Sequence, residues 1–274
     1  ISELLKAFNR TSFQSRTLAM CANIYVAMLE DPKRPTIFLG IAGAMVPAGM
    51  KGVVSTMVRR NMVDVIVSTG ANMYHDLVEA LGEHHYIGSP DAGDMMLRKE
   101  GIDRIYDTYA DESKFRMIDN MVMFFADELA DGKMSNSISS RSFLYSLGEF
   151  IDSKGTEEDR IDSIIWNCWK NGVPIFVPAM NDSSLGIALT QHYVKSLEKG
   201  RSPLVIDEIK DNYEILKIKK VAPKTGVIYV GGGVPKNYIQ QTAYLQDVFG
   251  MPNAEHDYGF QITTDSPQWG GLSG

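Results

Sequence analysis

The chain has 274 residues, 44% of them apolar, enough for the core of one large α/β domain or two small ones. Its net charge of −7 argues against nucleic-acid binding, which needs clustered Lys and Arg, and would suit a cationic substrate. No apolar run approaches the roughly 20 residues that cross a bilayer, and no signal peptide is visible, so we expect a cytoplasmic protein without membrane contact.

The two cysteines, Cys21 and Cys168, lie in apolar segments of helical pattern, so we expect reduced core residues. Because the sequence contains no CxxC pair, we expect no structural zinc and predict no metal site. The chain begins at Ile1 and stops at Gly274, and both ends look incomplete, so we expect further sequence beyond them.

Helical patterns alternate with short apolar runs along the chain. Helices are predicted near residues 12–29, 50–60, 73–81, 113–129, 139–150, 156–171, 209–221 and 235–249. The helix near 156–171 would open with a capping box at Thr156–Asp159. Strands are predicted at 36–40, 64–67, 173–177, 204–206, 226–230 and 258–262. This alternation predicts an α/β fold in which a mainly parallel sheet has helices on both faces, and one domain over residues 1–274.

Small or polar residues follow five of these strands. The strand exits are residues 40–49, 68–72, 178–184, 231–233 and 263–266. Ligands of open α/β sheets bind at the carboxyl ends of the strands, where helix N-termini offer N–H groups to a pyrophosphate. We therefore expect a nucleotide across these exits, although each glycine taken singly is also consistent with a tight turn and no GxGxxG fingerprint occurs.

Three polar or aromatic positions leave alternatives open. Asp182 could cap the helix that follows it, which is the more frequent role for its spacing, or it could bind a ribose or a nicotinamide amide. His75 stands beside Tyr74 just past an exit, where acid–base catalysis and a structural role are both possible. Trp269 lies in a loop of small residues, where it could stack on a ligand or anchor a subunit interface. The remaining histidines lie among polar neighbours and are predicted to be surface residues: His84, His85, His192 and His256.

Several stretches resemble those of one protein family, the deoxyhypusine synthases with their bacterial and archaeal relatives. The segment around Asp182 and the triple glycine 231–233 are the most specific matches, and the resemblance covers nearly the whole chain. It implies a Rossmann-like domain in a homotetramer, with NAD lying across the strand exits at the subunit interfaces. The other matching stretches are Thr36–Gly40 with Gly49, Asn61–Val65 leading to Ser68–Gly70, Asp76-Leu77, Gly172–Phe176, Pro178-Ala179, Ser184–Gly186, Val234–Lys236 and Ser273-Gly274.

The resemblance also implies an activity and a set of cofactor contacts. Members of the family take a hydride from spermidine and pass an aminobutyl group first to an enzyme lysine and then to a lysine of a translation factor. Because Asp182 is retained, the resemblance favours its cofactor role over capping. The implied cofactor-binding residues are Gly43, Ala44, Met45, Val46, Pro47, Thr69, Gly70, Asp182, Gly232, Thr264, Asp265 and Ser273.

The substrate side departs from the family pattern. The ammonium groups of a polyamine lose hydration on binding and need carboxylate partners. Where the family has acids, this sequence has Tyr74-His75, Ile187, Trp269 and Leu272, and Asn237 stands where the family has its active-site histidine. The family's nucleophilic lysine follows the Ser-Gly pair in a Ser-Trp-Gly-Lys segment, so its position lies beyond Gly274 and no lysine here matches it.

These features predict an NAD-dependent transferase of this type with an altered substrate pocket. Its substrate would be an amine that is less cationic than spermidine or held differently, with a protein lysine as the acceptor. His75 and Tyr74 are the catalytic candidates, and Asn237 and Trp269 are the substrate-binding candidates. The alternative is a catalytically inactive, tetrameric NAD-binding or scaffold protein, which the changed acids and the unseen lysine favour.

Overall fold

The fold is built on a five-stranded sheet in which all neighbouring strands are parallel, in the order β10-β9-β1-β2-β7. The computed structural model describes residues 2–131, 136–252, 255–266 and 268. This sheet confirms the predicted α/β fold, while the single-domain organisation stays a prediction. The strands are β1 (Thr36–Ile41), β2 (Val65–Ser68), β7 (Ile175–Phe176), β9 (Thr225–Val230) and β10 (Tyr258–Ile262).

The central strands are mostly apolar because both faces of the sheet are covered. Successive side chains of a strand point to opposite faces. On β1, Ile37 and Leu39 belong to a large apolar cluster, whereas Phe38 between them belongs to a smaller one. The large cluster draws on α2 (Phe13–Glu30), α3 (Lys51–Arg59), α4 (Gly70–Ala80), α6 (Glu112–Asp131), α7 (Ser140–Lys154), α9 (Ile164–Asn171) and α10 (Ser184–Glu198). The small cluster draws on α11 (Glu208–Val221) and α12 (Gly233–Val248).

The strand order reverses direction at β1. From β1 the chain continues to β2 on one side, and it returns much later to β9 on the other side. The exits of β1 and β9 therefore lead to helices on opposite faces of the sheet, α3 on one face and α12 on the other. This switch point is where open α/β sheets bind their ligands, and the site described below lies there.

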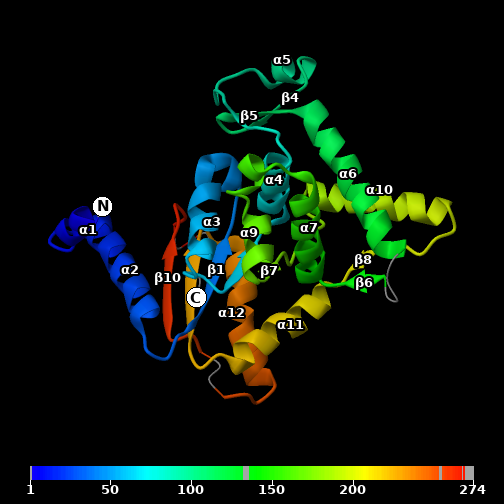
Figure 1. Ribbon diagram of the computed structural model, residues 1–274. Helices are drawn as coiled ribbons and strands as arrows, with labels where there is room; N and C mark the ends of the chain where they lie inside the picture. The colour runs from blue at the N-terminus through cyan, green and yellow to red at the C-terminus, as the bar shows by residue number, and fades with distance from the viewer. Residues whose placement is uncertain (1, 132–135, 253–254, 267, 269–274) are drawn as a thin grey trace.

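Two parts of the chain extend away from the sheet. At the N-terminus, α1 (Ser2–Phe8) and the first turns of α2 extend to the left in Figure 1, whereas the end of α2 packs against β10. A small antiparallel sheet of β3 (Tyr86–Ile87), β5 (Thr108–Asp111) and β4 (Ile102–Ile105), with α5 (Asp94–Lys99), projects at the top. We predicted no element between residues 82 and 112, because the strands there are short and no alternating pattern marks them.

Two predicted elements differ in the structure. The helix near 156–171 is two helices, α8 (Glu157–Arg160) capped by Thr156, and α9 capped by Ser163, because a buried carboxylate from α4 starts a new helix at that point. The strand at 204–206 is outside the main sheet: β8 (Val205–Ile206) pairs with β6 (Ser137–Ile138) in a separate two-stranded sheet. Among the described residues, no helix combines the length and apolar character that a bilayer span requires.

Candidate functional site

The exits of β1 and β2 are held together by hydrogen bonds. The side chain of Asn72 accepts from the backbone N–H of Val46 at 3.3 Å and donates to the carbonyl of Ile41 at 3.4 Å. The hydroxyl of Thr69 lies 3.5 Å from the carbonyl of Gly43. Since Thr69 also caps α4, the loop after β1 and the first turn of α4 form one fixed unit at the edge of the sheet.

The exit of β7 packs against this unit at a glycine. A methyl group added to Gly70 would lie 2.2 Å from the hydroxyl oxygen of Ser183 and 3.3 Å from the carbonyl oxygen of Met180. Gly70 therefore has to lack a side chain for the loop after β7 to approach α4 so closely. This contact brings the segment with Asp182 beside Thr69 and Gly70, as the prediction of a shared site requires.

The exit of β9 joins the same edge from the other side of β1. A Cβ on Gly231 would lie 2.9 Å from the Cβ of Ala42, and the φ of +80° at Gly231 is a left-handed conformation that favours glycine. The N–H of Gly231 donates to the carbonyl of Ile262 at the end of β10. The Lys236 ammonium donates to the Gln261 side chain, which in turn donates to the carbonyl of Gly231. All five strand exits thus meet along one edge.

The predicted cofactor-binding residues line this edge to different degrees. Gly43, Ala44 and Met45 form the loop after β1, and Val46 and Pro47 are buried at the start of the π-helical turn η1 (Val46–Met50). Gly232 is buried, whereas Asp182, Thr264 and Asp265 are exposed. The substrate candidate Asn237 is exposed on the first turn of α12. Trp269, Leu272 and Ser273 lie outside the described residues.

Asp182 does not cap α10. The N-cap is Ser183, whose hydroxyl accepts from the backbone N–H of Gly186 at 3.4 Å. Capping was the more frequent role for the spacing of Asp182, and the structure assigns that role to its neighbour. The Asp182 carboxylate is exposed at the edge instead.

Tyr74 and His75 lie on α4, and both are buried. The hydroxyl of Tyr74 donates to α6, where the carbonyl of Phe115 lies at 2.9 Å and Asp119 Oδ1 at 2.7 Å. Burial and the hydrogen bond with Asp119 raise the pKa of Tyr74 far above its ordinary value. Tyr74 therefore holds α6 against α4, and its phenol keeps its proton.

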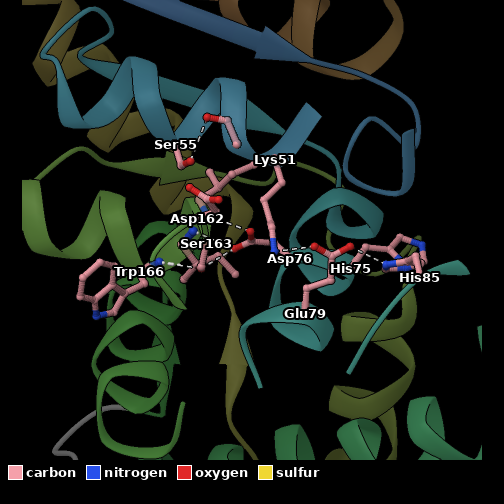
Figure 2. Close-up of polar contacts among 12 residues, drawn as sticks. Lys51, Ser55, His75, Asp76, Glu79, His85, Asp162, Ser163 and Trp166 are labelled. Atoms are coloured by element: carbon pink, nitrogen blue, oxygen red, sulfur yellow. Dashed lines mark hydrogen bonds and ion pairs between the residues drawn. The ribbon is translucent and has the colours of Figure 1, made fainter. Parts of the chain in front are cut away.

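His75 is the end of a chain of four titratable side chains (Figure 2). The Lys51 ammonium of α3 contacts Glu79 Oε2 at 2.5 Å, and Glu79 Oε1 lies 2.6 Å from Nδ1 of His85. Nε2 of His85 lies 2.9 Å from Nδ1 of His75. We call Lys51, Glu79, His85 and His75 the α4 relay. Only His75 was singled out from the sequence, since the other three meet it through tertiary contacts.

The α4 relay has the electrostatics of a buried ionic chain. Burial lowers the pKa of His75 to about 4; His85 adds to this, and Glu79 opposes it. For Glu79, burial acts to raise the pKa, but hydrogen bonds from His85 and Lys51 outweigh it and the pKa is lowered. At neutral pH the relay therefore holds an ionised Glu79 and a neutral His75, which can accept a hydrogen bond from a ligand.

Asp76 has a structural role beside the relay. Its fully buried carboxylate accepts from the N–H groups of Ile164 and Ile165 at 2.8 and 2.9 Å and from the hydroxyl of Ser163 at 2.8 Å (Figure 2). Burial raises the pKa of Asp76 to about 6, against the effect of these hydrogen bonds. Asp76 thereby fixes the start of α9 against α4, the helix that carries His75 and Glu79.

The prediction of surface histidines is wrong for His85 and His192, and it also fails for His256, which is only partly exposed and whose pKa burial lowers to about 4. The side chain of His85 is 6% exposed, within the relay. His192 is 1% exposed: its Nδ1 lies 2.6 Å from Asp127 Oδ1, and its Nε2 accepts from the backbone N–H of Leu204 at 2.8 Å. The residues next to His85 and His192 in the sequence are polar, so the sequence did not indicate that tertiary contacts bury these two side chains. Cys21 and Cys168 are free and buried, as predicted.

The edge and the α4 relay together offer several kinds of polar group. No group of three or more His, Cys, Asp or Glu side chains in the described ranges is arranged to hold a metal ion. The edge offers backbone N–H groups, small residues and the exposed carboxylates of Asp182 and Asp265, and the α4 relay offers a neutral imidazole. Such a set suits a polar organic ligand next to a proton acceptor.

Comparisons with known proteins agree on one family. A sequence profile described as deoxyhypusine synthase matches residues 3–274. The chain is 47% identical, over 100% of its length and 76% of the relative's, to a probable deoxyhypusine synthase 2 of Methanosarcina acetivorans. It is 41% identical to a deoxyhypusine synthase-like protein of Chlorobaculum tepidum, over 96% of this chain and 73% of that protein.

The fold has a solved counterpart as well. The crystal structure of a putative deoxyhypusine synthase from Entamoeba histolytica superimposes with a TM-score of 0.64, covering 85% of this chain and 76% of that one at 22% identity. At that identity the likeness concerns the fold alone. Together with the profile match and the relatives, the result is plain: the chain belongs to the deoxyhypusine synthase family.

Proposed function

We propose that the protein is an NAD-dependent transferase of the deoxyhypusine synthase type that acts on an amine through an altered substrate pocket. Family membership supports an aminobutyl-transferase-like function. The amine would lose a hydride to NAD, and the group left behind would pass to a lysine, with a protein lysine as the final acceptor. The family resemblance further suggests a homotetramer.

The meeting of the strand exits at the switch point is the observation that carries the proposal. NAD needs close backbone approach and N–H donors for its pyrophosphate. Gly43, Gly231 and Gly233 have positive φ values of +63°, +80° and +60°, and the first turns of α4, α10 and α12 all start at this edge. These residues fit a dinucleotide. When bound there, NAD supplies the hydride acceptor.

The altered pocket rests on the residues that replace family acids. Ile187, in the first turn of α10, leaves 56% of its surface exposed and cannot pair with an ammonium. His75 replaces another acid with a neutral acceptor. We propose His75 as the residue that receives a proton from the substrate, with Tyr74 fixing the helix beside it, and Asn237 as a substrate contact on α12.

Two binding measurements test the cofactor. Calorimetry should detect NAD binding, and a hundredfold excess of NAD over its Kd should stabilise the fold by about 2.7 kcal/mol, which raises the melting temperature by several degrees. Asp182→Ala should weaken the affinity for NAD. Asp91→Ala, an exposed loop acid in the small antiparallel sheet region, is the matched control and should bind NAD like the parent. Absence of heat and of any thermal shift would sink the proposal.

The alternative is an inactive NAD-binding or scaffold protein, which the loss of the acid at Ile187 favours. Incubation with NAD and a panel of polyamines separates the two. Formation of NADH, or a lysine adduct in the mass spectrum, supports the transferase. Binding of NAD without either product supports the inactive protein.

A further inference from the structure

We propose that His75, His85 and Glu79 form a proton relay, in which Nε2 of His75 takes a proton from the substrate's ammonium group and His85 carries the resulting charge beside Glu79. Lys51 sets how readily the relay accepts that proton. The identity of the donor rests on the proposed function above. The relay itself rests on the side-chain geometry of α4 and its neighbours.

The hydrogen bonds fix the positions of the ring protons. An ionised Glu79 only accepts, so Nδ1 of His85, 2.6 Å from Oε1, carries a proton. In neutral His85 the other nitrogen, Nε2, then accepts, and at 2.9 Å its donor is Nδ1–H of His75. Neutral His75 is thereby left with an unprotonated Nε2. That atom has no hydrogen-bond partner within the part of the chain that the structure describes.

A proton arriving at Nε2 of His75 moves a second proton along the relay. The N–H bond of the substrate ammonium breaks and an Nε2–H bond forms on His75. The Nδ1–H bond of His75 breaks and an Nε2–H bond forms on His85, which becomes an imidazolium. One proton has entered and one positive charge has appeared, and that charge is on the ring 2.6 Å from Glu79 rather than on His75.

The surroundings explain why the charge settles on His85. His75 is 8% exposed and packs against the ring of Phe115 on α6, an apolar contact that disfavours a cation there. His85 has the Glu79 carboxylate as a direct partner. A second proton would place two adjacent cations at a ring spacing of 4.9 Å, so the pair takes up one proton only.

Charged groups lie on the elements packed around the relay, and of these Lys51 acts on it directly. Lys51 of α3 forms an ion pair with Glu79, which also bonds to His85. This ion pair reduces the electrostatic stabilisation that Glu79 can give to a protonated His85. On α4, the buried carboxylate of Asp76 faces the start of α9. From α6, Asp119 is bonded to Tyr74, and Asp103 of β4 acts on the same phenol. Glu83 is paired with Lys114 at 2.9 Å rather than with a relay side chain.

The relay defines the amine that suits the site. A carboxylate at position 75 would hold an ammonium as a cation, whereas a relay that removes the proton leaves a neutral amine nitrogen. A neutral nitrogen can donate its lone pair to the adjacent carbon, which is what hydride loss from that carbon requires. The site would therefore select the amine nitrogen next to the carbon that reacts and bind it in its neutral form.

Nitrogen-detected NMR of the histidine rings tests the relay without NAD or amine. The chain has five histidines, so the signals of His75 and His85 can be assigned with His75→Gln and His85→Gln. At pH 8, His75 should carry its proton on Nδ1. On acidification His85 should become the imidazolium while His75 changes to the Nε2–H form. Observation of His75 as the imidazolium, or of Nε2–H on His75 at pH 8, would overturn the proposal.

Variants with opposite expected signs separate a relay from a structural cluster. Glu79→Gln should lower the midpoint of this titration by about one pH unit, a tenfold loss of proton affinity, because the charge on His85 loses its partner. Lys51→Met should raise the midpoint, because the charge of Glu79 is then no longer partly neutralised by Lys51 and stabilises a protonated His85 more strongly. Lys114→Met, which removes a cation paired with Glu83 outside the relay, should leave the midpoint unchanged. Equal shifts in all three variants would contradict the relay.

A second measurement adds the substrate. If spermidine and NAD yield NADH, the acidic limb of the pH profile for kcat/KM should shift down in Glu79→Gln and up in Lys51→Met, as the NMR midpoints do. If no amine of the polyamine panel yields NADH while the tautomers change as described, the proposed function fails and the relay stands. If NADH forms but the pH profile of kcat/KM is the same in both variants as in the parent, the relay does not take the substrate proton.

Discussion

The two halves of the site are built on opposite principles. Along the edge of the sheet, the strand exits meet because side chains are absent: Gly70 admits Ser183, and Gly231 admits Ala42. Along α4, the helix is fixed and charged because side chains are present and partnered, from Asp76 to the α4 relay. An added methyl group should therefore damage the first half, and a removed side chain should damage the second.

Under the proposed function, the difference also separates cofactor from substrate. Backbone and glycine suit the shared, invariant shape of a dinucleotide, which we propose binds at the edge. The titratable side chains of α4 would act on the substrate, and the resemblance implies that the sequence departs from the family there, at His75. The same helix thus begins at Gly70 in the cofactor half and continues into the substrate half one turn later.

The largest expected effect belongs to Asp76. In Asp76→Ala, two buried N–H groups of α9 and the hydroxyl of Ser163 lose their acceptor. We expect the free energy of unfolding to fall by about 3 kcal/mol, since each unsatisfied buried donor costs on the order of 1–3 kcal/mol and water replaces part of the loss. Denaturant unfolding measures it.

The exposed Asp182 serves as the comparison for Asp76. Among the described residues, the exposed Asp182 side chain makes no hydrogen bond, so the unfolding free energy of Asp182→Ala should stay within about 0.5 kcal/mol of the parent. If the two aspartate variants lose similar stability, the division between a packed α4 half and an open edge is wrong.

A glycine substitution probes the edge in the opposite way. Gly70→Ala places a methyl group 2.2 Å from the hydroxyl of Ser183, so the loop after β7 has to move, at a cost of about 1–3 kcal/mol. Gly93→Ala adds a methyl group in open space at the start of α5 and should be nearly neutral. Thermal unfolding compares the two.

A double variant shows whether that cost comes from the contact itself. Ser183→Gly removes the clashing side chain, so Gly70→Ala in that background should cost clearly less than it does alone. Additive losses would mean that Gly70 matters for another reason, such as the conformation of the first turn of α4.

The edge could be predicted from the sequence because its signals are local. Each exit is a short apolar run followed by small residues, and parallel strands bring their carboxyl ends to one edge whatever the loops do. Asp182 shows the limit of predicting the edge from sequence. The spacing could not tell whether Asp182 or its neighbour caps α10, and the structure shows that Ser183 is the cap.

The α4 relay could not be predicted in the same way. Glu79 lies one turn beyond His75 on α4, but Lys51 comes from α3 and His85 follows the end of α4, and their geometry depends on how these segments pack. The polar neighbours of His85 suggested solvent, and the small antiparallel sheet that begins at Tyr86 had no recognisable pattern. The relay therefore appeared only with the tertiary structure.

The smallest expected change in stability is the most informative about the substrate. Ile187→Asp introduces an acid at a position where the resemblance implies one in the family. The position is exposed in the first turn of α10, where a negative charge also suits the helix N-terminus. The unfolding free energy should change by less than about 0.5 kcal/mol. Calorimetry should show spermidine binding about tenfold more tightly, equivalent to about 1.4 kcal/mol.

Val194→Asp is the matched control for this variant. Val194 lies on the same helix, two turns beyond Ile187, and is 48% exposed against 56% for Ile187. It adds the same charge away from the strand exits, so it should leave spermidine binding unchanged. An equal gain in both variants would mean that net charge alone attracts the polyamine. A gain confined to Ile187→Asp would mean that this position faces the bound amine and that its apolar side chain is what excludes a second ammonium group.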